Sequence, residues 1–163
     1  MRGSGVTWRR GLLLVVAMLG LGLGLAVVVA VLPPRQTGEV PMPGQDATPE
    51  QVVTAFTRAL DAHDCTTAVA LATEGGGRDQ AERWCHDIGA LQEVEVGSSV
   101  TEDPAWSGLP AGTEVVHVPV SFELTWRRFH ADGSMDEGVT AWGYRLVRAT
   151  PDEPWRIIDQ GVA

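Results

Sequence analysis

Two cysteines are the residues best suited to covalent chemistry in this 163-residue chain. Cys65 and Cys85 are its only cysteines, and His63 and His86 lie close to them in the sequence. Cysteine and histidine are both zinc ligands, so a metal site is one interpretation. The other is a disulfide, which persists only in an oxidising compartment.

The spacing favours the disulfide. Cys85 and His86 are adjacent and would point about 100° apart on a helix, and the two Cys–His pairs match no zinc motif. An even number of cysteines in an exported segment is typical of a disulfide. We therefore predict a Cys65–Cys85 bond that joins two short helices, and we expect no metal or other cofactor.

Export is predicted by residues 11–32, which are 22 consecutive residues without a charge. A helix needs about 20 apolar residues to cross a bilayer, whereas the apolar stretch of a secretory signal has about 7–15. We predict a transmembrane helix at 11–32. Cleavage as a signal is the alternative, because Val28 and Ala30 are small enough to suit a signal peptidase.

The orientation follows from the charges that flank this segment. Three arginines precede it and only Arg35 follows closely. The positive-inside rule then places residues 1–10 in the cytoplasm and the rest of the chain outside. Arg9-Arg10 also resembles a twin-arginine export signal, although ordinary topology-setting charge is the preferred interpretation. We expect a single-pass protein of the plasma membrane with an extracytoplasmic domain.

The charge of that domain limits its partners. Residues 36–163 carry eight arginines and all 21 acidic residues, a net charge of −13. Nucleic-acid binding needs a basic face, so we expect no nucleic acid. The expected partners are the membrane, through the N-terminal helix, and an envelope protein. Gly20 and Gly24 form a GxxxG pair that would also allow a homodimer.

The helical part is predicted from local signals. Residues 33–47 contain four prolines and should form a semi-extended spacer. Thr48 and Gln51 make a capping box that starts a helix ending near residue 63, so the domain should span 48–163. Asp64 should cap a short second helix, and a third is predicted at about 79–88. The three glycines at 75–77 should form a flexible connection.

The period then changes from 3.6 to 2, which predicts strands at 91–100, 113–129, 139–149 and 155–160. Pro119 argues for an edge position or a bulge, and Asp132-Gly133 marks a hairpin turn. Helices followed by an antiparallel meander predict an α+β domain, with three helices packed on one face of a curved sheet.

Two segments carry a family resemblance. The run TPEQVVTAFTRALDAHDCTTAVALA from Thr48 resembles the opening helices of the nuclear transport factor 2-like superfamily, and PWRIIDQGV resembles its last strand. The resemblance implies a cone-shaped α+β domain with a pocket between sheet and helices. It does not imply one function, because the family includes isomerases, dehydratases, carrier-binding modules and assembly proteins of secretion systems.

An isomerase-like site in such a pocket needs a carboxylate or histidine base with a donor opposite. The conceivable members are Asp61, Asp64, His117, Tyr144 and Asp159. Their spacing does not bring them together, so we assign no catalytic residue. The tryptophans at 84, 126, 142 and 155 have apolar neighbours and should lie in the core. Trp106, between two prolines, is the best functional candidate among the tryptophans if it is exposed.

The expected function is a membrane-anchored, non-catalytic module that binds a protein partner or a small apolar ligand. The alternative is a pocket enzyme of the isomerase or dehydratase kind. The interior of the domain distinguishes them: convergent ionisable groups favour the enzyme, and an apolar or filled interior favours the module.

Overall fold

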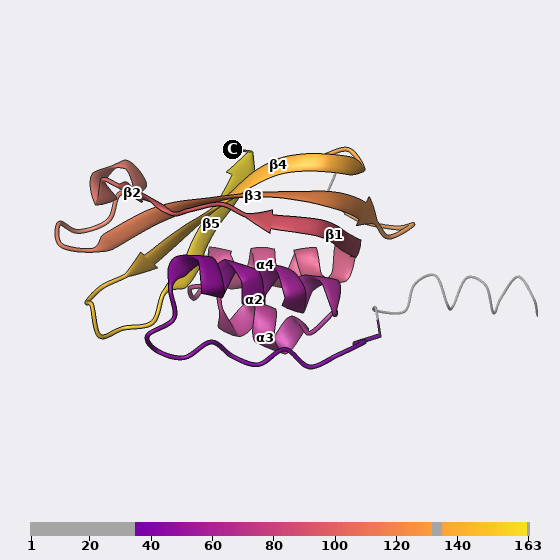
Figure 1. Ribbon diagram of the computed structural model, residues 1–163, viewed down its shortest axis with the longest axis horizontal. Coiled ribbons are helices and arrows are strands. Elements are labelled where there is room, and N and C mark those ends of the chain that lie inside the picture. Colours follow the sequence, from indigo (N-terminus) through magenta and orange to yellow (C-terminus); the bar gives the residue numbers. More distant parts are fainter. Residues whose placement is uncertain (1–34, 132–134, 163) are drawn as a thin grey trace, which may run out of the picture. The chain divides into compact units, whose positions relative to one another are not determined.

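The protein is described by a computed structural model that covers residues 35–131 and 135–162. In these ranges three α-helices precede an antiparallel sheet, which confirms the α+β class (Figure 1). Along the chain the elements are α2 (Pro49–Asp61), α3 (Cys65–Ala70), α4 (Gly76–Asp87), β1 (Ile88–Val96), β2 (Val100–Glu102), the 3-10 helix η1 (Pro104–Ser107), β3 (Glu114–Trp126), β4 (Gly138–Arg148) and β5 (Arg156–Val162).

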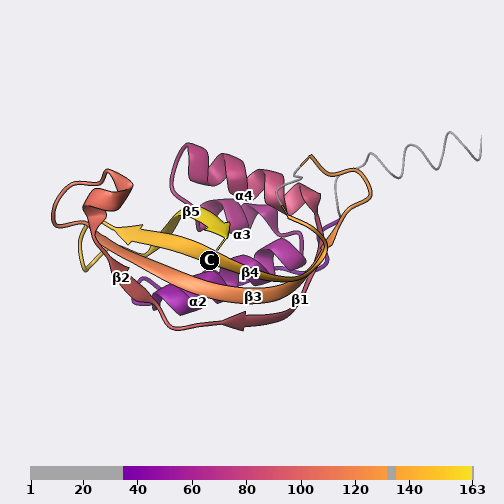
Figure 2. The same cartoon turned by 90° about the horizontal axis from the view of Figure 1, so that it is seen from above.

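The three α-helices lie on one side of the sheet (Figures 1 and 2). The predicted membrane helix at 11–32 and the predicted turn at Asp132-Gly133 fall outside the described residues. Over residues 35–131 and 135–162, no helix is both long and apolar enough to cross a membrane.

Local capping determines where the first two helices begin. The Thr48 side chain accepts a hydrogen bond from the Gln51 N–H, and the Gln51 side chain accepts one from the Thr48 N–H. This is the predicted capping box. At α3 the Asp64 carboxylate accepts from the Thr67 N–H, as predicted for its N-cap.

The predicted spacer is docked on the domain from Thr37 onward. The N–H of Thr37 donates to the Ala62 carbonyl at 2.9 Å. The N–H of Val40 donates to Asp64 Oδ2 at 2.9 Å, and the Thr67 hydroxyl donates to the Val40 carbonyl at 3.2 Å. This segment has no helix or strand, as its prolines require, yet Asp64 and Thr67 satisfy its backbone.

The glycines at 75–77 do not form a flexible connection. Gly75 is the N-cap of α4, and Gly76 and Gly77 belong to its first turn. A Cβ on Gly77 would lie 2.7 Å from Thr73 Oγ1 and 3.1 Å from the Ile157 carbonyl oxygen. Glycine is therefore needed here because α4 begins against the backbone of β5, and α4 starts earlier than predicted.

The sheet has the strand order β1-β3-β4-β5, and β2 pairs with the same edge of β3 as β1. Strand β3 is thus central, so of the two positions predicted for Pro119, an edge strand or a bulge, the edge strand is wrong. The neighbouring chain is interrupted opposite this proline, between Val96 and Val100. There Gly97 donates its N–H to the Pro119 carbonyl at 2.8 Å. Because Pro119 has no N–H of its own, the ladder breaks at this point.

The core fills the space between helices and sheet. Trp84 of α4 packs against Trp126 and Trp142, with ring centroids 6.2 and 5.2 Å apart. Phe56 of α2 meets Tyr144 of β4 edge-on at 5.3 Å. Trp155 is buried too, so the predicted core tryptophans are confirmed.

Candidate functional site

The helices leave one sheet face uncovered, which we call the outer face. It bears the side chains that alternate with the buried ones along each strand. Its members are Gln92, Glu95, Val100, Glu102, Val115, His117, Pro119, Ser121, Glu123, Thr125, Val139, Ala141, Gly143, Arg145, Val147, Arg156, Asp159 and Gly161.

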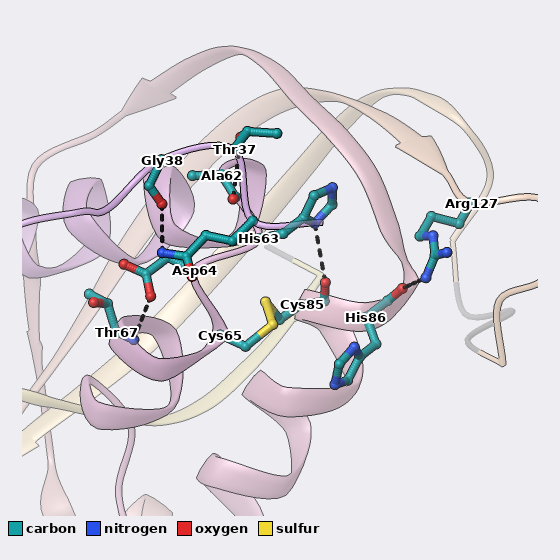
Figure 3. Close-up of a disulfide and its surroundings, with 11 residues drawn as sticks. Thr37, Gly38, Ala62, His63, Asp64, Cys65, Thr67, Cys85, His86 and Arg127 are labelled. Atoms are coloured by element: carbon teal, nitrogen blue, oxygen red, sulfur yellow. Dashed lines mark hydrogen bonds between the residues drawn. A yellow bond between two sulfur atoms is a disulfide. The ribbon is translucent and has the colours of Figure 1, made fainter. Parts of the chain in front are cut away.

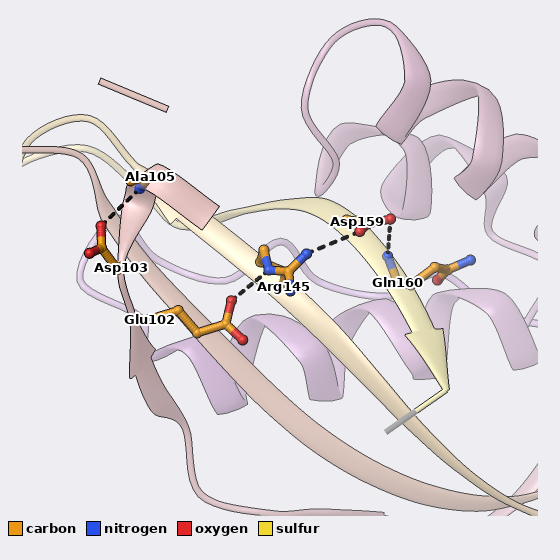
Figure 4. A network of polar contacts seen from close by, with 6 residues as sticks. All are labelled: Glu102, Asp103, Ala105, Arg145, Asp159 and Gln160. Carbon is orange, nitrogen blue, oxygen red and sulfur yellow. Dashed lines mark hydrogen bonds and ion pairs between the residues drawn. The ribbon is translucent and has the colours of Figure 1, made fainter. Parts of the chain in front are cut away.

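An ion-pair network spans three strands of this face (Figure 4). Arg145 on β4 donates from Nε to Glu102 Oε2 at 2.6 Å and from Nη1 to Asp159 Oδ2 at 3.2 Å. The register places Arg145 opposite Asp159 on β5, and Glu102 reaches it from β2. The hydrogen bond to Glu102 raises the pKa of Arg145, so its charge is fixed.

Beside the network lies a hollow of about 260 Å³, lined in part by His117, Gly143 and Gly161. The His117 imidazole lies directly over Gly143, where a Cβ would overlap the ring. Above Gly161, by contrast, a Cβ would find open space. The imidazole makes no hydrogen bond within residues 35–131 and 135–162. Gly161 thus forms the open floor, and the half-buried His117 covers Gly143 and forms one wall.

The chemistry available in this hollow is electrostatic. Two carboxylates face one guanidinium, which leaves an excess of negative charge. No serine or cysteine lines the hollow beside the imidazole, so the described residues contain no nucleophile–base pair there. The arrangement is suited to attracting a cationic group.

The interior between sheet and helices is different. Among the described residues, Asp64 is the only buried carboxylate, and it is occupied as the cap of α3. Tyr144 is fully buried, and burial raises its pKa, which keeps it protonated. The Tyr144 hydroxyl, the Trp142 Nε1–H and the Gln160 amide are buried without hydrogen-bond partners in the described part of the chain.

The conceivable catalytic residues are therefore dispersed. Asp61 accepts a hydrogen bond from the Leu91 N–H at 2.9 Å, and Asp64 is a cap. Tyr144 lies in the interior, whereas His117 and Asp159 line the hollow on the opposite face.

Sequence reasoning missed Arg145, Glu102 and Gly143. The alternation along residues 139–149 is a signal that could have placed Arg145 on the outer face. The choice of its partners depends on strand register, which the sequence does not reveal.

The predicted disulfide is confirmed (Figure 3). The Sγ atoms of Cys65 and Cys85 are bonded, with Cα atoms 5.6 Å apart. Neither cysteine is then available as a zinc ligand. The flanking histidine His63 places Nδ1 3.3 Å from the Cys85 carbonyl oxygen. Over the described ranges no group of three or more metal-binding side chains occurs.

Trp106 is exposed, at 78% of its surface. It lies in η1, whose N-cap Asp103 accepts from the Ala105 N–H. Its exposure keeps Trp106 the best functional candidate among the tryptophans.

No known protein-family model matches the chain, and no curated protein matches it. The likeness to the nuclear transport factor 2-like superfamily therefore rests on the two sequence segments alone.

Proposed function

We propose that this protein is a membrane-anchored module that binds a protein partner outside the cytoplasm without catalysing a reaction. The anchor and its orientation rest on the uncharged segment 11–32 and the arginines before it. The order of helices and strands is compatible with the nuclear transport factor 2-like fold, which we retain as part of the proposal.

The observation that carries the proposal is that the buried residues of the described interior include no side chain free to act as a general acid or base. General acid–base catalysis needs a positioned group that changes protonation near neutral pH, and contributes about 10²- to 10⁴-fold. The described interior offers Tyr144, protonated by burial, and Asp64, which is engaged by two backbone N–H groups. This argues against the isomerase or dehydratase alternative.

A second candidate, small-ligand binding in the interior, is favoured by one observation. Tyr144 and Gln160 lie opposite each other on β4 and β5 with unpartnered polar atoms. Each such atom costs about 1–3 kcal/mol when buried without a partner. A small uncharged ligand that hydrogen-bonds to both would remove that cost.

The outer face supports protein binding instead. Val100 and Val139 expose 60% and 85% of their surface there. The small, exposed Ala141 lets another backbone approach closely. Exposed apolar surface on a part of the sheet that the α-helices leave open is typical of an interaction site.

The test compares matched variants of the full-length protein in its own membrane. Ala141→Arg places a long charged chain on the outer face, and Glu82→Arg places one on the exposed side of α4. After mild solubilisation, we expect wild type and Glu82→Arg to migrate in the same complex larger than one chain. Ala141→Arg should migrate as the isolated chain. If all three migrate as isolated chains, or Ala141→Arg keeps the complex, the proposal is wrong.

A further inference from the structure

We infer that the outer face binds a protein surface that presents arginine or lysine side chains beside aliphatic ones. This names the partner class of the proposed module and so rests on that proposed function. The first observation is the charge of the face. It carries four carboxylates, at Glu95, Glu102, Glu123 and Asp159, against the two arginines Arg145 and Arg156.

Two of these carboxylates are not neutralised by any other described residue. Glu102 and Asp159 are held by Arg145. Glu95 and Glu123 are exposed, and neither has an ion-pair partner in residues 35–131 and 135–162. They are therefore free to accept cations from another molecule. Such charges at the margin of an interface act mainly on specificity and association rate.

Apolar side chains lie next to the unpaired carboxylates. Val139 on β4 is directly opposite Glu123 on β3, and Ala141 is opposite Ser121, which itself pairs with Glu95. Opposed residues on one sheet face have Cβ atoms about 4.5–5.5 Å apart. One partner element can thus cover Val139 and reach both carboxylates, so the face presents a combined apolar and acidic pattern.

Electrostatics disfavours the other occupants. A second copy joined through this face would oppose the same carboxylates to themselves, because a two-fold interface uses one patch twice. Anionic lipid headgroups and nucleic-acid phosphates would be repelled by the face and by the net charge of −13 over residues 36–163. A cationic protein surface has the matching sign.

The probe is a labelled ten-residue peptide in which arginine and valine take turns at every second position, with serine between them. Both kinds of side chain then lie on one side when the peptide is extended. Two matched peptides replace arginine by glutamate, or valine by serine. Binding is measured by fluorescence anisotropy to the full-length protein in phosphatidylcholine nanodiscs, with empty nanodiscs as the blank. We expect saturable binding of the Arg–Val peptide, weaker binding of Arg–Ser and none of Glu–Val.

The protein variants locate the site. Glu95→Gln with Glu123→Gln should weaken Arg–Val binding about three- to tenfold, the range for two exposed charge pairs. Val139→Ser should weaken it about threefold by removing exposed aliphatic surface. Glu74→Gln with Glu82→Gln, an equal loss of charge around α4, should leave it unchanged.

Equal weakening by both double substitutions would overturn the inference, because only net charge would then matter. No saturable binding of Arg–Val, or equal binding of Glu–Val, would overturn it as well. If the native complex nevertheless dissociates in Ala141→Arg, protein binding by this face stands and only the cationic partner class fails.

Discussion

Removing the disulfide should destabilise the domain without unfolding it. Cys65 and Cys85 are 20 residues apart and join α3 to α4. In the chain-entropy model, closing a loop of this length restricts the unfolded chain by about 3 kcal/mol. Cys85 is fully buried, so Cys65→Ala/Cys85→Ala also removes a packed sulfur, at roughly 1 kcal/mol more. Domains of this kind have about 5–15 kcal/mol of stability, so the variant should remain folded.

The assay is urea unfolding of the protein in a non-ionic detergent, followed by tryptophan fluorescence. Reduced wild type is the matched control, because it keeps both sulfur atoms and loses only the bond. We expect reduced wild type to lose about 3 kcal/mol and the double variant about 4 kcal/mol. A loss below about 1 kcal/mol in reduced wild type would refute the reasoning that the bond acts on the unfolded chain.

Three further predictions concern single side chains. Asp64→Ala removes the cap of α3 and the acceptor that holds the docked spacer. It should lower the free energy of unfolding in urea by about 2–4 kcal/mol and speed up amide exchange in residues 37–40. Hydrogen bonds from Ser99 lower the pKa of Glu50 to about 2. The free energy of unfolding of wild type should therefore fall by about 1 kcal/mol, discounted for the exposure of Glu50, as the pH falls from about 5 to 2. Glu50→Gln should lack that part of the pH dependence. Gly143→Ala should lower the free energy of unfolding by about 1–2 kcal/mol, because its methyl group would overlap the His117 imidazole. In a His117→Ala background, as a double-mutant cycle would measure, the same substitution should cost much less.

The first two helices, their caps and the disulfide were predictable because their signals are local. Thr48 and Gln51 cap a helix through atoms three residues apart. The Cys65–Cys85 disulfide could be predicted from the number and spacing of the cysteines and from the predicted export of the segment. The alternation along 113–129 likewise identified the buried side of β3 without knowledge of its neighbours.

The centre of the outer face was not predictable, because it depends on which residues lie opposite one another. Arg145 meets Asp159 only through the β4–β5 register, which a bulge shifts by one residue. Pro119 can lie in the central strand only because the neighbouring chain is interrupted between β1 and β2. No local sequence signal predicted that interruption. Gly76 and Gly77 were misassigned because tight packing against β5, rather than flexibility, requires glycine there.

The most direct test of binding through the outer face is photo-crosslinking in intact membranes. A photoreactive amino acid replaces Ala141 on the outer face or, as the control, Glu82 on α4, in the full-length protein. The account predicts one discrete adduct with another protein from position 141 and none from position 82. Adducts from position 82 alone, or none from either position, would contradict it.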